Sequence, residues 1–172
     1  MSEDNHKHTG NCCPSTNEGI LQSQAGNLVN LARFWHEKNQ AAPVNPARDA
    51  LLEAAGKLLI LAGGYDCEAG IWLYTISGDA AMKAHDVKLA NEHFKQALSV
   101  AGVVNSDESP SYGICLGNLG ECKLEAGDKE GARRDLEAAR AIFARESVIG
   151  GQYTMDFVDQ IRGEIDRLIA SI

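Results

Sequence analysis

The chain has 172 residues, carries a net charge of −8, and is 44% hydrophobic but only 6% aromatic. This size allows one domain with a sizeable core, and the acidic balance argues against nucleic acid, because phosphate binding requires clustered Lys and Arg. No stretch approaches the roughly 20 apolar residues of a membrane span, and the polar start MSEDNHKHTG lacks the apolar segment of a signal peptide. The cytosol is the expected compartment, and five cysteines without scaffold spacing fit its reducing conditions.

Residues 1–18 are predicted to form a disordered tail, and residues 19–172 to form one helical domain. The tail segment is rich in polar residues and has no periodicity. It contains four residues of types that bind soft metals, namely His6, His8, Cys12 and Cys13. Adjacent cysteines are not the CxxC pair of a usual zinc site, so incidental ligands in a flexible tail are the preferred interpretation. A metal-responsive protein stays open as an alternative, and no cofactor or metal is assigned.

Apolar residues at helical spacing predict seven helices. The first runs from Ile20 to about Gln40, the second from Pro46 to about Ala62, the third from Asp66 to about Ala84, and the fourth to about Val103. Two more form a hairpin across Leu116–Ile142, and the seventh follows the link Ser147–Gln152.

Helix boundaries carry recognisable end signals. Asn45 is predicted to cap the second helix, with Pro46 at its first position. Gly127 is predicted to end the fifth helix in a left-handed conformation, Asp128 to cap the sixth, and Thr154 to cap the seventh.

A repeat organises these helices. The pattern Ala90-x-x-x-Phe94-x-x-Ala97 recurs as Ala132-x-x-x-Leu136-x-x-Ala139, at an offset of 132 − 90 = 42 residues. Turns and links keep the same offset. A period in this range indicates an all-α solenoid, in which each helical hairpin buries one face on the next. About three and a half hairpins are present.

The stretch Pro110–Phe143 resembles a tetratricopeptide repeat. The resemblance rests on Leu116-x-x-Leu119-Gly120 in the first helix, Gly127-Asp128 at the turn, and the small residues of the second helix. The 42-residue period and the acidic link ending at Pro110 are similar to the kinesin-light-chain type, whose LNNLA-like core corresponds to Leu116-Gly117-Asn118-Leu119-Gly120 here. The resemblance implies a right-handed solenoid and a non-enzymatic protein-binding function. Lys123 stands where the family has an aromatic residue, so packing is expected to differ there.

A weaker similarity concerns the stretch Gly120–Asp128, which resembles the small tetratricopeptide chaperones of type III secretion. A chaperone or adaptor for a secreted protein therefore stays open as an alternative function.

The first helix of each hairpin lines the concave face in such repeats. In the fifth helix, Ile114, Asn118 and Glu121 lie on one face. The residues 42 or 84 positions before them and 42 positions after them give three rows: Asn30, Trp72, Ile114 and Asp156; Phe34, Ile76, Asn118 and Gln160; Glu37, Asp79, Glu121 and Gly163. The predicted peptide-binding residues are Phe34, Glu37, Trp72, Ile76, Asp79, Ile114, Asn118 and Glu121.

This groove would have an apolar middle beside three carboxylates, which suits a peptide or partner helix with apolar and basic residues. The resemblance implies that Asn118 hydrogen-bonds the ligand's backbone. The family's Lys/Arg pairs for an acidic ligand are missing, because Arg33 and Lys83 stand isolated in the pattern. Two alternatives stay open: the carboxylates are simply solvated, or the apolar groups are buried under the tail or in a different register.

No catalytic set can be assembled, and no GxGxxG, phosphate loop or HExxH is present. The protein is therefore predicted not to be an enzyme. Cys115 and Cys122 are expected in the core, and His85 and His93 on a polar surface. The polar residues of the seventh helix favour a solenoid cap, and hence a monomer or weak dimer.

Overall fold

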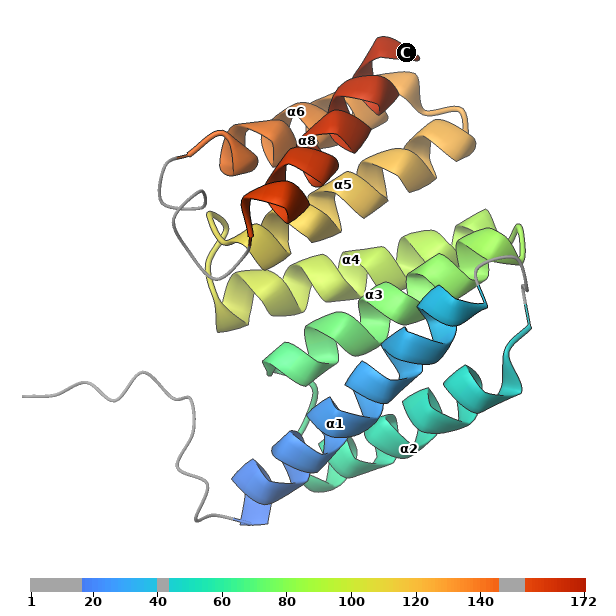
Figure 1. The fold of residues 1–172 in the computed structure, drawn as a ribbon, viewed down its shortest axis with the longest axis vertical. Coiled ribbons are helices and arrows are strands. Elements are labelled where there is room, and N and C mark those ends of the chain that lie inside the picture. Colours follow the sequence, from blue (N-terminus) through green and yellow to red (C-terminus); the bar gives the residue numbers. More distant parts are fainter. Residues whose placement is uncertain (1–16, 40–43, 146–153) are drawn as a thin grey trace, which may run out of the picture.

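The computed structural model describes residues 17–39, 44–145 and 154–172, which contain seven helices and no strand (Figure 1). The helices are α1 (Asn17–Lys38), α2 (Pro46–Leu61), α3 (Glu68–Lys83), α4 (Val87–Val104), α5 (Pro110–Glu125), α6 (Lys129–Phe143) and α8 (Met155–Ala170). The prediction of an all-α helical-repeat solenoid with seven helices is confirmed. Helix α1 begins three residues before the predicted start at Ile20, and the rest of the predicted tail lies outside the described residues.

The predicted end signals act as expected. The side chains of Asn45, Asp128 and Thr154 each accept a hydrogen bond from the backbone N–H three residues on, at 3.1, 3.0 and 3.3 Å. Pro46 occupies the first turn of α2. Gly127 has φ +84°, the left-handed conformation that glycine adopts without steric cost. The third helix begins at Glu68, two residues after the predicted start at Asp66, and its N-cap is Cys67.

The 42-residue period is visible in the seams between paired helices. Gly78 of α3 faces Phe94 of α4, and one period later Gly120 of α5 faces Leu136 of α6. A Cβ on Gly120 would lie 2.7 Å from Leu136 Cγ, so glycine allows the two helices to approach. Equivalent residues therefore make the same close contact in two successive hairpins.

The first hairpin departs from this scheme. His36 and Arg48 stand one period before Gly78 and Ala90, and both are buried. Arg48 Nη1 lies 3.4 Å from His36 Nδ1, and the Lys83 ammonium lies 3.0 Å from His36 Nε2. Burial, then the two cations, lower the pKa of His36 to about 4. A polar cluster thus replaces the small residues of the later seams.

The hairpins follow one another along the molecule in chain order, and α8 lies against the last one (Figure 1). The stacking is uneven. Helix α3 packs more on α1 than on α2, whereas α5 packs more on α4 than on α3, and α8 packs on α6. The packing between successive hairpins therefore varies along the chain.

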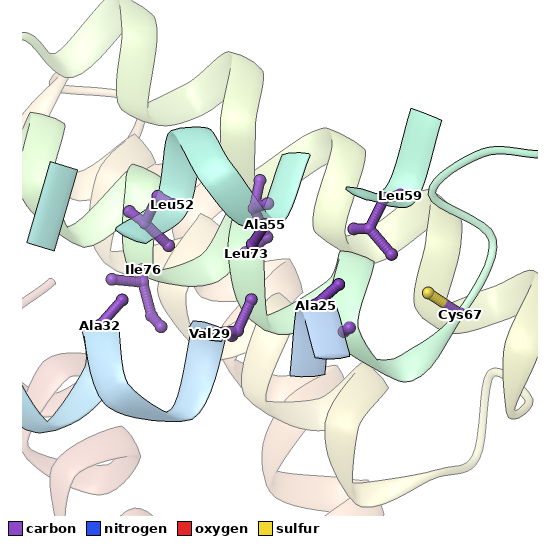
Figure 2. Packing of buried hydrophobic residues seen from close by; sticks show 10 residues of the cluster. Ala25, Val29, Ala32, Leu52, Ala55, Leu59, Cys67, Leu73 and Ile76 are labelled. Carbon is purple, nitrogen blue, oxygen red and sulfur yellow. The ribbon is translucent and has the colours of Figure 1, made fainter. Parts of the chain in front are cut away.

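Apolar clusters fill the junctions between hairpins. Figure 2 shows the first one, in which side chains from α1, α2, α3 and the turn before α3 point toward one another. Cys67 belongs to this cluster, and Cys115 and Cys122 belong to two others between α3, α4 and α5. The prediction that Cys115 and Cys122 are core residues is confirmed. Burial raises the pKa of Cys115 to about 12 and also raises the pKa values of Cys67 and Cys122.

Lys123 fills the corner where the family has an aromatic residue. Its ammonium forms an ion pair with Asp135 of α6, and both side chains are largely buried. Asp135 also accepts from Arg134 at 3.4 Å. An ion pair thus joins α5 to α6 in place of an aromatic contact.

The histidines differ in environment. His85 is exposed, as predicted, in the turn before α4. His93 is half-buried, with its ring centroid 6.2 Å from that of Tyr74, so the prediction of a polar surface position is wrong for it. None of the helices in the described ranges is long and apolar enough to cross a membrane.

Candidate binding groove

A pocket of about 360 Å³ opens between α5 and α8. Its α5 side carries Ile114, Gly117, Asn118 and Glu121, at the three- and four-residue steps of one helix face. Its α8 side is mainly aliphatic, with a polar rim; the residues are Ile161, Glu164, Ile165, Arg167, Leu168 and the adjoining Ser171. Apolar walls with a few polar groups are typical of a ligand-binding concavity.

Three charged side chains line the mouth of the pocket: the Glu121 carboxylate on α5, and the Glu164 carboxylate and the Arg167 guanidinium on α8. Partial burial, then repulsion from Glu164 and Glu125, raise the pKa of Glu121. Arg167 directs its Nε to the Gly163 carbonyl of its own helix, at 3.1 Å. A cationic group placed between Glu121 and Glu164 would relieve their repulsion, so the mouth favours a positively charged guest.

Three of the predicted peptide-binding residues meet at this pocket. Ile114 is 9% exposed and forms part of its floor, whereas Asn118 is half-buried and Glu121 is exposed. Sequence reasoning missed the opposite wall. It extended the rows of the groove to Asp156, Gln160 and Gly163 of the last helix, whereas the pocket is lined there by Ile161, Ile165 and Leu168.

Trp72 lies beside the pocket rather than in it. Its Nε1 donates to Glu68 at 2.8 Å, and Arg33 Cζ lies 5.7 Å from its ring centroid. The ring packs against both the first cluster and the cluster that contains Ile114. Trp72 therefore joins two cores and is covered on one side by Arg33.

Ile76 is not available to a ligand. It is 2% exposed and points into the first core cluster, next to Ala32 and Leu52 (Figure 2). The sequence frame placed it on the concave surface, but close packing of α3 on α1 covers it. This expectation of an exposed anchor is therefore wrong.

Phe34 and Glu37 make contacts within α1. Phe34 is exposed, with Trp35 edge-on at 5.9 Å and Lys38 Nζ 5.6 Å from its ring centroid. Glu37 is exposed and lies 3.9 Å from Arg33. Neither residue lines the pocket.

Asp79 belongs to the polar cluster of the first hairpin. Its carboxylate lies 3.9 Å from His36 Nε2. Burial raises the pKa of Asp79 to about 7, with Lys83 opposing the shift and Glu121 adding to it. Lys83 is therefore part of this cluster.

No group of three or more His, Cys, Asp or Glu side chains in the described part of the chain could hold a metal ion. The candidate metal ligands His6, His8, Cys12 and Cys13 lie outside the described residues.

The stacked hairpins and the pocket along α5 define a helical-repeat protein that presents a concave surface. Residues 70–145 match the family model described as tetratricopeptide repeat, which supports a relationship to that superfamily over this stretch. Such repeats generally mediate protein–protein interactions, and the family is a non-enzymatic interaction module. The match does not separate the kinesin-light-chain type from others, so that resemblance stays a prediction. A search of curated proteins found no significant match.

Proposed function

We propose that the protein is a non-enzymatic binding module that holds a peptide or partner helix in the pocket between α5 and α8. The observation that carries this proposal is the combination of aliphatic walls with two facing carboxylates at the mouth. The guest would insert an aliphatic side chain between Ile114 and Ile161 and place a Lys or Arg between Glu121 and Glu164.

Asn118 has a distinct role in this proposal. Its side-chain amide lies on the α5 wall and offers both a donor and an acceptor. An extended or helical segment exposes backbone amides that such a group can bind. Asn118 would thus fix the guest's direction, while the carboxylates select its charge.

The test uses a panel of short labelled peptides that present Leu or Ile beside Lys or Arg, and a matched panel with Glu at the basic position. Fluorescence anisotropy would measure their affinities at low and high salt. Binding is expected only for the basic panel. Glu121→Gln and Glu164→Gln should weaken it and flatten its response to salt, because long-range attraction between charges is screened.

Asn118→Ala should weaken binding about fivefold, the value of one hydrogen bond of about 1 kcal/mol, without altering the response to salt. Glu137→Gln is the matched control, since it removes the same charge from an exposed position of α6 that does not line the pocket. Unchanged affinity in both Asn118→Ala and Glu121→Gln would place the bound peptide on another surface and refute the proposal.

A further inference from the structure

The polar cluster of the first hairpin contains a hydrogen-bond conflict at the ring of His36. Arg48 Nη1 lies 3.4 Å from Nδ1 of this ring, and Lys83 Nζ lies 3.0 Å from Nε2. A guanidinium and an ammonium are donors only, whereas a neutral imidazole accepts at one nitrogen and donates at the other. If both neighbours are charged, one protonated ring nitrogen therefore faces a donor.

His36 does not resolve the conflict by changing its own charge. The residue is buried, and burial, Lys83 and Arg48 lower its pKa to about 4, so the ring is neutral near pH 7. A protonated ring would carry an N–H at both nitrogens and would face a donor at each of them. The neutral ring must accept from one neighbour and donate to the other.

Arg48 cannot be the neighbour that accepts. Its guanidinium has no acceptor atom and is not deprotonated in proteins. The side chain is also held in place, because Nε and Nη2 lie 2.7 and 2.6 Å from Asp49 Oδ1 and the residue is 3% exposed. Nη1 of this fixed group donates to His36, so Nδ1 has to accept and Nε2 has to carry the ring's proton.

Lys83 is the neighbour that can change its protonation. After losing one proton, its amine has a lone pair that accepts from the Nε2–H of His36 at 3.0 Å. Asp79, one turn earlier on α3, is not an alternative acceptor, because its carboxylate lies 3.9 Å from Nε2, beyond hydrogen-bond range. Burial lowers the pKa of Lys83, with Asp79 opposing the shift and Arg48 adding to it. The hydrogen-bond pattern, burial and the charge of Arg48 thus all favour the neutral amine.

The titratable and charged groups that act on this cluster come from α1, α2, α3 and α5. They are His36 on α1, Arg48 and Asp49 on α2, Asp79 and Lys83 on α3, and Glu121 on α5. Burial raises the pKa of Asp79 to about 7, with Lys83 opposing the shift and Glu121 adding to it. Both Asp79 and Lys83 lie within 4 Å of the same ring nitrogen. A carboxyl group that can release a proton therefore stands near an amine that can attack.

We propose that Lys83 is a site of covalent modification, whose amine condenses with small aldehydes at neutral pH to form a Schiff base. Lysines are activated in this way when they are desolvated or lie next to another cation. The side chain is half-buried, which limits the reaction to small aldehydes. Neither Lys83 nor Asp79 lines the pocket between α5 and α8, so this site is independent of the proposed binding function.

The reaction is a condensation that releases one water molecule. The Nζ lone pair attacks the carbonyl carbon of the aldehyde, and the carbonyl oxygen leaves as water. The nitrogen loses its two protons, so that one C=N bond and one water replace one C=O bond and two N–H bonds. Asp79 gives a proton to the departing oxygen and takes one back from the nitrogen, as a general acid and base.

The test treats the full chain with propanal and cyanoborohydride, which reduces the Schiff base to a stable amine, and measures each lysine by peptide mass spectrometry. Exposed Lys95 of α4 is the internal reference, because the ratio of Lys83 to Lys95 cancels the reagent's own pH dependence. The neutral fraction of a lysine with the usual pKa falls about 100-fold from pH 9 to pH 7, so we expect this ratio to be about tenfold higher at pH 7. Lys123 is the matched control, since it is also largely buried but is paired with Asp135, and its ratio to Lys95 should not rise.

Two variants separate the amine from its proton donor. Arg48→Met removes the fixed donor, so that Nδ1 can carry the ring's proton and Nε2 can accept from a Lys83 ammonium; the rise in the ratio should be lost. Asp79→Asn should slow the trapping of propanal at Lys83 about tenfold or more at pH 7. It should not slow acetylation of Lys83 by N-hydroxysuccinimide acetate, which needs no proton donor.

Circular dichroism of each variant would verify that it is folded, and the wild-type ratio decides the proposal even if Arg48→Met does not fold. Equal ratios at pH 7 and pH 9 would overturn it, as would the absence of a propanal adduct at Lys83. A folded Arg48→Met that keeps the full rise would overturn it as well, because the conflict at His36 would not be the cause. An unchanged rate of propanal trapping in Asp79→Asn would refute the proton transfer.

Discussion

Gly120 offers the sharpest test of the seam between α5 and α6. In Gly120→Ala the new Cβ would lie 2.7 Å from Leu136 Cγ and 3.3 Å from the Ala132 carbonyl oxygen. Leu136 is fully buried and cannot withdraw into solvent. Overpacking of this kind costs about 1–3 kcal/mol, against a gain of about 1 kcal/mol from replacing glycine inside a helix. We expect a net loss of about 1–2 kcal/mol, since one of the contacts is with backbone.

The matched control lies three residues earlier on the same helix. A Cβ on Gly117 would meet no heavy atom within 4 Å. Gly117→Ala should therefore show only the gain in helix propensity and stabilise the protein by up to about 1 kcal/mol. Urea denaturation followed by circular dichroism would give both values, provided that the m-values agree. If Gly120→Ala proves as stable as Gly117→Ala, Gly120 does not mark a helix contact and the seam argument fails.

Two further predictions concern buried charges. Lys123→Met should destabilise the protein by about 2–3 kcal/mol, because the buried Asp135 would keep only the exposed Arg134 as an ion-pair partner. In urea denaturation, adding Asp135→Leu should restore most of the lost stability. A double variant no more stable than Lys123→Met would contradict this reasoning. The pKa of Asp79 is raised from 3.8 to about 7, so between these pH values the folded protein holds a proton that the unfolded chain releases, and stability falls as pH rises. The pKa of His36 is lowered from 6.5 to about 4, so between about pH 4 and 6.5 the unfolded chain holds the extra proton, and stability rises with pH. Between about pH 4 and 6.5, the slope of unfolding free energy against pH should be more positive in Asp79→Asn than in wild type, and more negative in His36→Gln. Equal slopes in all three proteins would show that this cluster does not cause the pH dependence.

Much of the fold could be predicted because its signals are local. Asn45, Gly127 and Asp128 end or begin helices through contacts within a few residues, which the sequence displays directly. The small residues at the α5–α6 seam were also recognisable, since Gly120 and Ala132 recur with the period.

The groove was predicted less well because it depends on how hairpins are placed on one another. The 42-residue frame assumed that every hairpin packs on the next in the same way. In the structure α3 packs more on α1 than on α2, and this packing buries Ile76. It also places Arg33, rather than Phe34, beside Trp72. One signal in the sequence indicated that the first hairpin differs. His36 and Arg48 stand there at positions that hold small residues in the later hairpins. Their consequence for α3 depends on contacts distant in sequence, which periodicity does not encode.

The three buried cysteines can serve as natural probes of local unfolding. Cys67, Cys115 and Cys122 lie in three separate apolar clusters, and each has a raised pKa. A thiol reagent reacts with the thiolate and needs access to it, so each cysteine is alkylated only when its surroundings open. Peptide mass spectrometry over a labelling time course would separate these three rates from those of Cys12 and Cys13. The ratio of the rates would rank the junctions by the free energy needed to open them, without any engineered probe.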